Sequence, residues 1–290
     1  MFAAAYSQAS AFTKPVIISH VRPDGQCFAG IGSFVVVNDD GWFLTAAHVF
    51  TEFENLNTSK NAAAAHAAAE AAIRNDTSLL LDQKKKRLRA LGQLDPKGAT
   101  DFSFWWASDA VAVQNVTRIV DADIAVGRLV PFDPGSVANY PVFKDPAKRI
   151  ASGTSLCRLG FPFHEIKPTY KAGIFTLPPE TFPVVFFPNE GILTRALIIG
   201  QTAEVFTGFI ETSSPGLRGQ SGGPIFDQHG TVWAIQSHTS HLPLGFSPPV
   251  PNGKPGEKEH QFLNVGRGTH PATIVGLLTK LGVKHTLSDY

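Results

Sequence analysis

Short apolar runs, separated by glycine and proline, limit the fold of this chain more than any other feature. The sequence holds 26 glycines and 21 prolines among 290 residues. Brief apolar runs bounded by turn residues are typical of β-strands, and many of them together indicate barrels or sandwiches. We expect strands over the following residues: 16–19, 33–37, 42–45, 124–129, 155–159, 197–199, 205–210 and 232–237.

A helical hairpin is expected to interrupt the strands. Residues 61–74 are rich in alanine, which has the highest helix propensity, and a second helix is expected over 78–91. Together these helices predict an insertion at about 55–100. It is interpreted either as a passive surface elaboration, which we favour, or as a binding element for a regulatory protein. The basic run at 84–87 is interpreted as a solvated helix face, so no nucleic-acid partner is expected.

The C-terminal part predicts one more helix and a long loop. Pro271 suits a first helical turn and Gly282 a helix end, so we expect a helix at about 270–282. The segment 242–259 is rich in proline and glycine, which predicts an extended mobile loop.

One serine lies in a glycine-rich run, Gly-Gln-Ser-Gly-Gly-Pro, at residues 219–224. Glycines leave backbone amides free to face a reacting carbonyl, as an oxyanion hole requires. A serine hydroxyl is a poor nucleophile without a base and a group that orients the base. The run therefore predicts Ser221 as a nucleophile that needs two partners.

Two segments upstream of this serine offer those partners. His48 follows an apolar strand and two alanines, whose small side chains leave room for an imidazole. Asp123 precedes apolar residues at the expected start of a strand, where its carboxylate can accept a hydrogen bond from the imidazole and fix the tautomer. Asp121 is the second candidate for this role.

The serine run is also compatible with the nucleophile elbow of α/β-hydrolases. That motif requires a helix directly after the serine, with the acid and the histidine later in the chain. Pro224 and the expected hairpin around 225–230 argue against such a helix. A catalytically silent protease-fold module that binds peptides is a further alternative.

The order His48, Asp123, Ser221 resembles that of the trypsin-like (chymotrypsin-fold) serine peptidases. The resemblance rests on Thr-Ala-Ala-His before His48, Asp-Ile-Ala-Val from Asp123, and the glycine-rich run around Ser221. Further segments are similar to the bacterial HtrA-like type, here without a PDZ domain: 32–36, 160–163 and 209–212.

The resemblance implies an all-β fold of two antiparallel six-stranded β-barrels, with a helical insertion in the first barrel and a C-terminal helix. The N-terminal barrel would span 1–145 and carry His48 and Asp123. The C-terminal barrel would span 146–290 and carry Ser221. The amides of Gly219 and Ser221 would then form the oxyanion hole.

The same resemblance implies a group of substrate-binding residues. Ser237 would support the aspartate, and the strand from Ser237 to Thr239 would pair with the substrate backbone. Pro215 stands where trypsin carries an acid, so cleavage after lysine or arginine is not expected. His238 or Thr239 would select acidic or polar side chains, and a small aliphatic preference is an equal alternative. The loop 242–259 would lie near this pocket and gate it.

Composition restricts the remaining function classes. The net charge of +1 argues against a nucleic-acid or membrane partner. No basic segment precedes the apolar start, so a cytoplasmic location is expected. Cys27 and Cys157 are expected to be reduced, buried thiols. The sequence predicts a serine endopeptidase that uses neither a cofactor nor a metal and forms an acyl-enzyme on peptide or protein substrates. We expect it to be regulated and narrow in substrate range.

Overall fold

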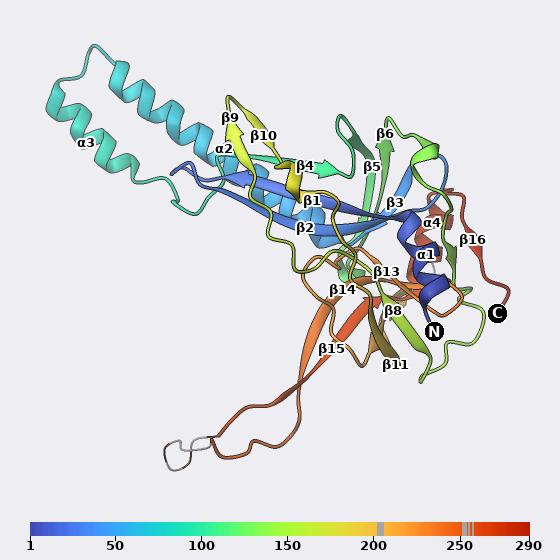
Figure 1. Ribbon diagram of the computed structural model, residues 1–290. Helices are drawn as coiled ribbons and strands as arrows, with labels where there is room; N and C mark the ends of the chain where they lie inside the picture. The colour runs from blue at the N-terminus through green and yellow to red at the C-terminus, as the bar shows by residue number, and fades with distance from the viewer. Residues whose placement is uncertain (202–205, 251–253, 255, 257) are drawn as a thin grey trace.

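The computed structural model describes residues 1–201, 206–250, 254, 256 and 258–290. In the described part it consists of two large β-sheets and a two-stranded ribbon, with four α-helices around them (Figure 1). A helical hairpin projects from the first sheet, and a long β-hairpin projects from the second (Figure 1). Among the described residues, none of the helices is both long and apolar enough to cross a membrane.

The first sheet has six antiparallel strands in the order β4-β1-β2-β3-β6-β5. Their bounds are β1 Thr13–Val21, β2 Cys27–Val36, β3 Trp42–Thr45, β4 Asp101–Trp106, β5 Ala112–Ile119 and β6 Ile124–Val130. In the described chain no pairing joins the edge strands β4 and β5. The sheet is therefore an open half-barrel.

The second sheet has the order β13-β8-β11-β12-β15-β14-β7-β16, and β13 also pairs with β14. Its strands are β7 Val142–Phe143, β8 Ser155–Arg158, β11 Asn189–Gln201, β12 Phe206–Thr212, β13 Pro224–Phe226, β14 Val232–Pro243, β15 Phe262–Thr269 and β16 Thr286–Leu287. A separate ribbon holds β9 Thr169–Lys171 and β10 Ile174–Thr176. The fold is mostly β, as expected, but two closed six-stranded barrels are not confirmed because the first sheet is open.

Two of the four helices form the predicted insertion, and its start differs from the expected one. Helix α2 spans Ala47–Asn75 and helix α3 spans Leu81–Leu91. The first turn of α2 therefore contains His48, well before the alanine-rich residues. Buried Val49 and Leu56 hold the early part of the helix against the protein. Tertiary packing therefore stabilises a helical segment that lacks the alanine-rich composition of the later residues.

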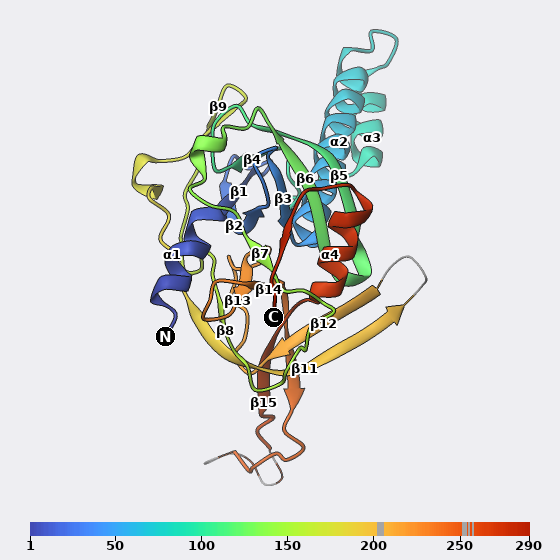
Figure 2. The same cartoon turned by 90° about the vertical axis from the view of Figure 1, so that its right-hand side faces the viewer.

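The other two helices lie near the ends of the described chain. Helix α4, Pro271–Lys280, confirms the predicted C-terminal helix. Helix α1, Ala3–Phe12, was not expected. Although α1 leads directly into the first sheet, the adjoining Phe2 ring packs edge-on against Phe226 of the second sheet, with centroids 6.2 Å apart. Figure 2 shows α1 and α4 on opposite sides of the molecule.

The buried core is continuous between the sheets. One cluster of apolar side chains includes Phe34 and Phe43 of the first sheet together with Phe143 and Phe226 of the second. Strands of the first sheet end at Val130 and those of the second begin at Val142. The domain division at 145 and 146 stays a prediction.

Some expectations concern residues whose structure is only partly described. Residue 205 of the predicted strand 205–210 lies outside the described residues, and so do 251–253, 255 and 257 of the predicted loop 242–259. In the described part of this loop, Pro249 forms an isolated bridge with Lys258. Both cysteines are free, Cys157 buried and Cys27 partly exposed.

Candidate active site

His48 and Asp123 form a two-point contact beside the second sheet. The Nδ1 atom of His48 lies 2.9 Å from Asp123 Oδ2 and 3.1 Å from Oδ1, and the His48 amide donates to Oδ1 at 2.9 Å. The aspartate therefore fixes both the backbone and the ring of the histidine. The imidazole side chain is 48% exposed and the carboxylate 16% exposed. The ring can thus reach a substrate while its partner stays largely covered.

The backbone around Asp123 aims its carboxylate at the histidine. A short 3₁₀ helix at Val120–Ala122 ends there, and Asp123 takes a left-handed conformation with φ of +48°. Thr269 of the second sheet donates its hydroxyl to the Ala122 carbonyl at 2.8 Å, which holds this turn in place. Asp121, the alternative candidate, is exposed and no hydrogen bond joins it to His48 in the described structure.

Ser237 joins the second sheet to this pair. Its hydroxyl donates to Asp123 Oδ2 at 2.5 Å and lies 2.8 Å from His238 Nδ1. Burial alone would raise the pKa of Asp123, but hydrogen bonds from His48 and Ser237 outweigh it and hold the pKa below its usual value. The carboxylate is therefore ionised at neutral pH and can stabilise an imidazolium.

The loop around Ser221, residues 219–224, is tied to both sheets. The Ser221 carbonyl accepts a hydrogen bond from Ser33 N at 2.8 Å, and the Gly222 amide donates to the Gln236 carbonyl at 2.8 Å. Gly222 has a φ of +84°, and a Cβ there would lie 2.1 Å from the Ser33 carbonyl oxygen. Only glycine fits this position. The glycine that follows Ser221 therefore has a steric cause.

Two amides of this loop are available to a ligand. Within the described part of the chain, neither Gly219 N nor Ser221 N donates a hydrogen bond to another residue. Gly219 has a φ of +95°, and its carbonyl is held by Phe161 N at 3.0 Å and by the Ser33 hydroxyl at 2.8 Å. Free amides on a fixed loop are the donors that an oxyanion hole requires.

The Ser221 hydroxyl is not joined to the histidine in this structure. In the described residues it makes no hydrogen bond within 3.5 Å, with His48 or with any other group. The two segments are nevertheless neighbours, because Gly32 lies between Ser221 and Val49: a Cβ on Gly32 would be 3.6 Å from the Ser221 carbonyl oxygen and 3.7 Å from Val49 Cγ2.

The expected substrate-binding residues lie around the same loop. The Thr239 hydroxyl donates to the Gly216 carbonyl at 2.7 Å, and the Pro215 carbonyl accepts from Asn189 Nδ2 at 2.8 Å. The exposed His238 packs edge-on against Phe209. Burial and then nearby Arg267 lower the pKa of His238.

Two residues beside this loop, Arg158 and Gln236, were missed by the sequence reasoning. Arg158 ends β8 with 1% exposure, and its Nε donates to Gln236 Oε1 at 2.6 Å. The signal available in the sequence was a charged residue inside the expected buried strand 155–159.

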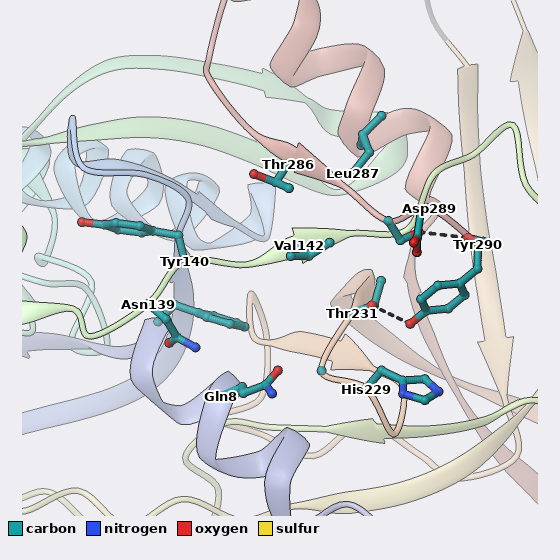
Figure 3. Close-up of a pocket in the computed structure, with 13 residues that line it drawn as sticks. Gln8, Asn139, Tyr140, Val142, His229, Thr231, Thr286, Leu287, Asp289 and Tyr290 are labelled. Carbon is teal, nitrogen blue, oxygen red and sulfur yellow. Dashed lines mark hydrogen bonds between the residues drawn. The ribbon is translucent and has the colours of Figure 1, made fainter.

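Two cavities of the protein are lined by other residues. One of about 450 Å³ has Gln8, Tyr140 and His229 among its lining residues, and in it the Tyr290 hydroxyl lies 2.7 Å from the Thr231 hydroxyl oxygen (Figure 3). Neither this cavity nor an apolar one of about 600 Å³ beside α2 includes a predicted site residue. Among the described residues, no three His, Cys, Asp or Glu side chains are grouped to hold a metal ion.

Solved structures that are similar to this chain include two proteases. One is the Rv3671c protease of M. tuberculosis in its active form, with 14% identity, a TM-score of 0.48, and coverage of 98% of this chain and 86% of that one. The other is the HtrA-type protease AlgW with a tripeptide, with 14% identity, a TM-score of 0.45, and coverage of 98% and 64%.

Sequence comparison gives the family. A search of curated protein sequences found no match. Residues 32–235 match the family model described as the trypsin-like peptidase domain. This match covers His48, Asp123 and the Ser221 loop, so the chain belongs to the trypsin-like peptidase family.

Proposed function

We propose that this protein is a serine endopeptidase in which His48, Asp123 and Ser221 form the catalytic triad. The observation that carries the proposal is the double contact of Asp123 with His48, at 2.9 Å from the ring and 2.9 Å from the backbone amide. Such a contact holds a histidine in the tautomer whose other nitrogen is free to take a proton.

The reaction follows the usual course of acyl transfer. His48 takes the proton of the Ser221 hydroxyl as its oxygen attacks a peptide carbonyl, and Asp123 stabilises the imidazolium. The backbone amides of Gly219 and Ser221 donate hydrogen bonds to the oxyanion. The imidazolium returns its proton to the leaving amine, which leaves an acyl-enzyme. Water, activated by His48, then releases the acid and restores Ser221.

The first test compares the native chain with Ser221→Ala on a library of peptides. We expect the variant to lose cleavage of every peptide that the native chain cuts, with Ser78→Ala, on the exposed turn between α2 and α3, as the control. A fluorophosphonate probe should label the native chain and the control only. Persistent cleavage by Ser221→Ala would overturn the assignment.

A catalytically silent peptide-binding module is the second candidate. It is favoured by one observation, namely that the Ser221 hydroxyl makes no hydrogen bond to His48 in the described structure. The probe experiment separates the two functions, because folded protein without label would support the binding module.

The biological setting belongs to the same proposal. Since His48 lies in the first turn of α2, a protein that binds the projecting α2–α3 hairpin would act on the helix that carries the proposed base. Regulation through this hairpin, a narrow range of protein substrates and a cytoplasmic location complete the proposed function.

A further inference from the structure

A chain of hydrogen bonds continues from the proposed triad into strand β14. His48 Nδ1 lies 2.9 Å from Asp123 Oδ2, and the Ser237 hydroxyl donates to the same oxygen at 2.5 Å. Beyond Ser237, the Nδ1 atom of His238 lies 2.8 Å from the hydroxyl oxygen. The proposed reaction uses His48 and Asp123 but leaves this last link, from His238, without a role.

A β-bulge brings the side chains of Ser237 and His238 together. Gln236 of β14 pairs with Gly268 of β15. The next pair joins His238 to Arg267, so Ser237 has no partner of its own in the described ladder, and two residues of β14 lie opposite one of β15. Successive side chains of a regular strand point to opposite faces, which would separate a hydroxyl from an imidazole on the next residue. The bulge re-aims them, and the two polar atoms meet.

The carboxylate at the centre of the chain determines which atom donates in each link. The pKa of Asp123 is held below its usual value, so the ionised group can only accept, and the one hydroxyl hydrogen of Ser237 is directed to it. In the next link the donor is therefore His238 Nδ1–H and the acceptor is the hydroxyl oxygen. Burial, followed by nearby Arg267, lowers the pKa of His238. The ring is thus neutral at neutral pH, with its single N–H group on Nδ1.

Both members of this last link are held by their surroundings. Ser237 is 2% exposed. The His238 ring packs edge-on against the buried ring of Phe209, with centroids 5.5 Å apart and an angle of 82° between the ring planes. A hydroxyl hydrogen rotates to suit its partners, and a donor placed at the oxygen leaves the hydrogen directed at the carboxylate.

We propose that His238 is a positioning residue for the triad, because its Nδ1–H group holds the Ser237 hydroxyl in the orientation that donates to Asp123. Hydrogen bonds in such a chain polarise one another, so the donor on His238 strengthens the bond from Ser237 to the carboxylate. Asp123 in turn holds the ring of His48. The inference rests on the proposed function and gives His238 a role other than the choice of substrate side chain.

The first experiment replaces the donor. His238→Leu removes the N–H group, and we expect kcat on a cleaved peptide to fall about tenfold, as the loss of one hydrogen bond does, with KM changed less than about twofold. His238→Asn keeps an NH₂ donor near the position of Nδ1 and should stay within about threefold of the native kcat. His241→Leu, at an exposed position of the same strand, is the control and should keep the native kcat. Equal losses in His238→Leu and His238→Asn, or a change in KM alone, would overturn the inference.

A double-mutant cycle tests the path through Ser237. Ser237→Ala removes the hydroxyl that joins His238 to Asp123. In that background, His238→Leu should lower kcat by less than about twofold, because residues of one hydrogen-bond network do not act additively. Circular dichroism checks that each variant is folded. Losses that multiply in the folded double variant would mean that His238 acts by another route, and would contradict the proposal.

The rate of fluorophosphonate labelling separates positioning from substrate binding. A small fluorophosphonate reacts with Ser221 with the help of His48 but carries no peptide side chain. We expect His238→Leu to slow labelling by about the same factor as kcat. Labelling at the native rate in His238→Leu, with slower peptide cleavage, would retain the proposed function and overturn the positioning role. Folded native protein that is neither labelled nor active would overturn both.

Discussion

Asp123 is the residue on which the proposed chemistry most depends, because it accepts three hydrogen bonds, from His48 N, His48 Nδ1 and the Ser237 hydroxyl. Asp123→Asn keeps the size but places an NH₂ group against donors, which favours the wrong histidine tautomer. We expect kcat to fall by about 10⁴ with KM changed far less. Steady-state kinetics would measure this, with exposed Asp121→Asn as the control. Comparable losses in both variants would reassign the acid.

Gly222 permits a test of the backbone in the loop around Ser221. A Cβ there would lie 2.1 Å from the Ser33 carbonyl oxygen and 2.2 Å from Thr45 Oγ1, at a φ of +84°. We expect Gly222→Ala to lower the free energy of unfolding by about 2–5 kcal/mol, from overpacking and strain combined.

The control for this substitution lies in helix α4. A Cβ added to Gly276 would meet no neighbouring side chain or loop within 4 Å. Gly276→Ala should raise stability by about 0.5–1 kcal/mol, since alanine is the better helix former. Chemical denaturation measures both changes. A neutral Gly222→Ala would show that the loop is not sterically fixed.

The residues of the proposed triad could be chosen from sequence because each lies in its own short motif. Asp123 was separable from Asp121 only by pattern, and the contact with His48 supplies the physical distinction. Gln236 and Arg158 have no such motif. Their arrangement depends on β8 and β14 meeting behind the loop through β13, and a single sequence does not contain that pairing.

At the scale of elements, propensity predicted the insertion but not its beginning. The alanine-rich residues of α2 favour a helix by themselves, whereas residues 47–60 are held in a helix by contacts with the rest of the protein. Lys60 pairs with Asp101 at 2.6 Å, and Glu54 pairs with Arg118 at 2.5 Å. Helix α1 was missed although half of its residues are alanine, and its buried residues pack against distant parts of the chain.

Helix α4 carries a pH dependence at its N-terminus. His270 caps it by accepting from Ala272 N at 3.1 Å, and burial lowers the His270 pKa to about 4. Between this value and the unfolded pKa of about 6.5, the unfolded chain binds a proton that the native protein does not. His270 therefore costs stability as the pH falls through this range, on the order of 3 kcal/mol in total.

The variant His270→Asn tests this account. Asparagine can still accept from Ala272 N as an N-cap but does not titrate. We expect the free energy of unfolding to fall less between pH 6.5 and 4 in the variant than in the native protein. Denaturation curves at several pH values measure the difference, and parallel pH profiles would rule out His270 as its source.

At the scale of the whole molecule, the edges of the first sheet, β4 and β5, line an apolar cavity of about 600 Å³ together with the start of α2. Phe50 stacks on Trp106 with centroids 5.7 Å apart, and Phe53 packs edge-on against Phe102 and Phe104. These contacts join the start of α2 to β4. The short apolar runs predicted strands within β1, β2, β3 and β6 but neither edge strand, β4 or β5. Whether such edges pair depends on contacts between segments far apart in the chain, which a single sequence does not contain.

The shared core predicts that the two sheets unfold together. Phe12, at the end of α1, is 1% exposed and belongs to the cluster that contains Phe34 of the first sheet and Phe226 of the second. Phe12→Ala should lower the free energy of unfolding by about 3–5 kcal/mol, as cavity formation in a core does. Because one core joins the two sheets, we expect the same loss of protection against hydrogen exchange for backbone amides in both.

Native-state hydrogen exchange measures this loss strand by strand. Slowly exchanging amides of β3 and of β12 should lose equal protection in Phe12→Ala, because one cooperative opening exposes both. Ile174→Ala removes a side chain that is 66% exposed and should change neither strand by more than about 0.5 kcal/mol. A loss confined to β3 would mean that the sheets open independently. In that case the hydrogen bond from Thr269 to the Ala122 carbonyl would break independently of either core, and the geometry of Asp123 would depend only on the contact between the two sheets.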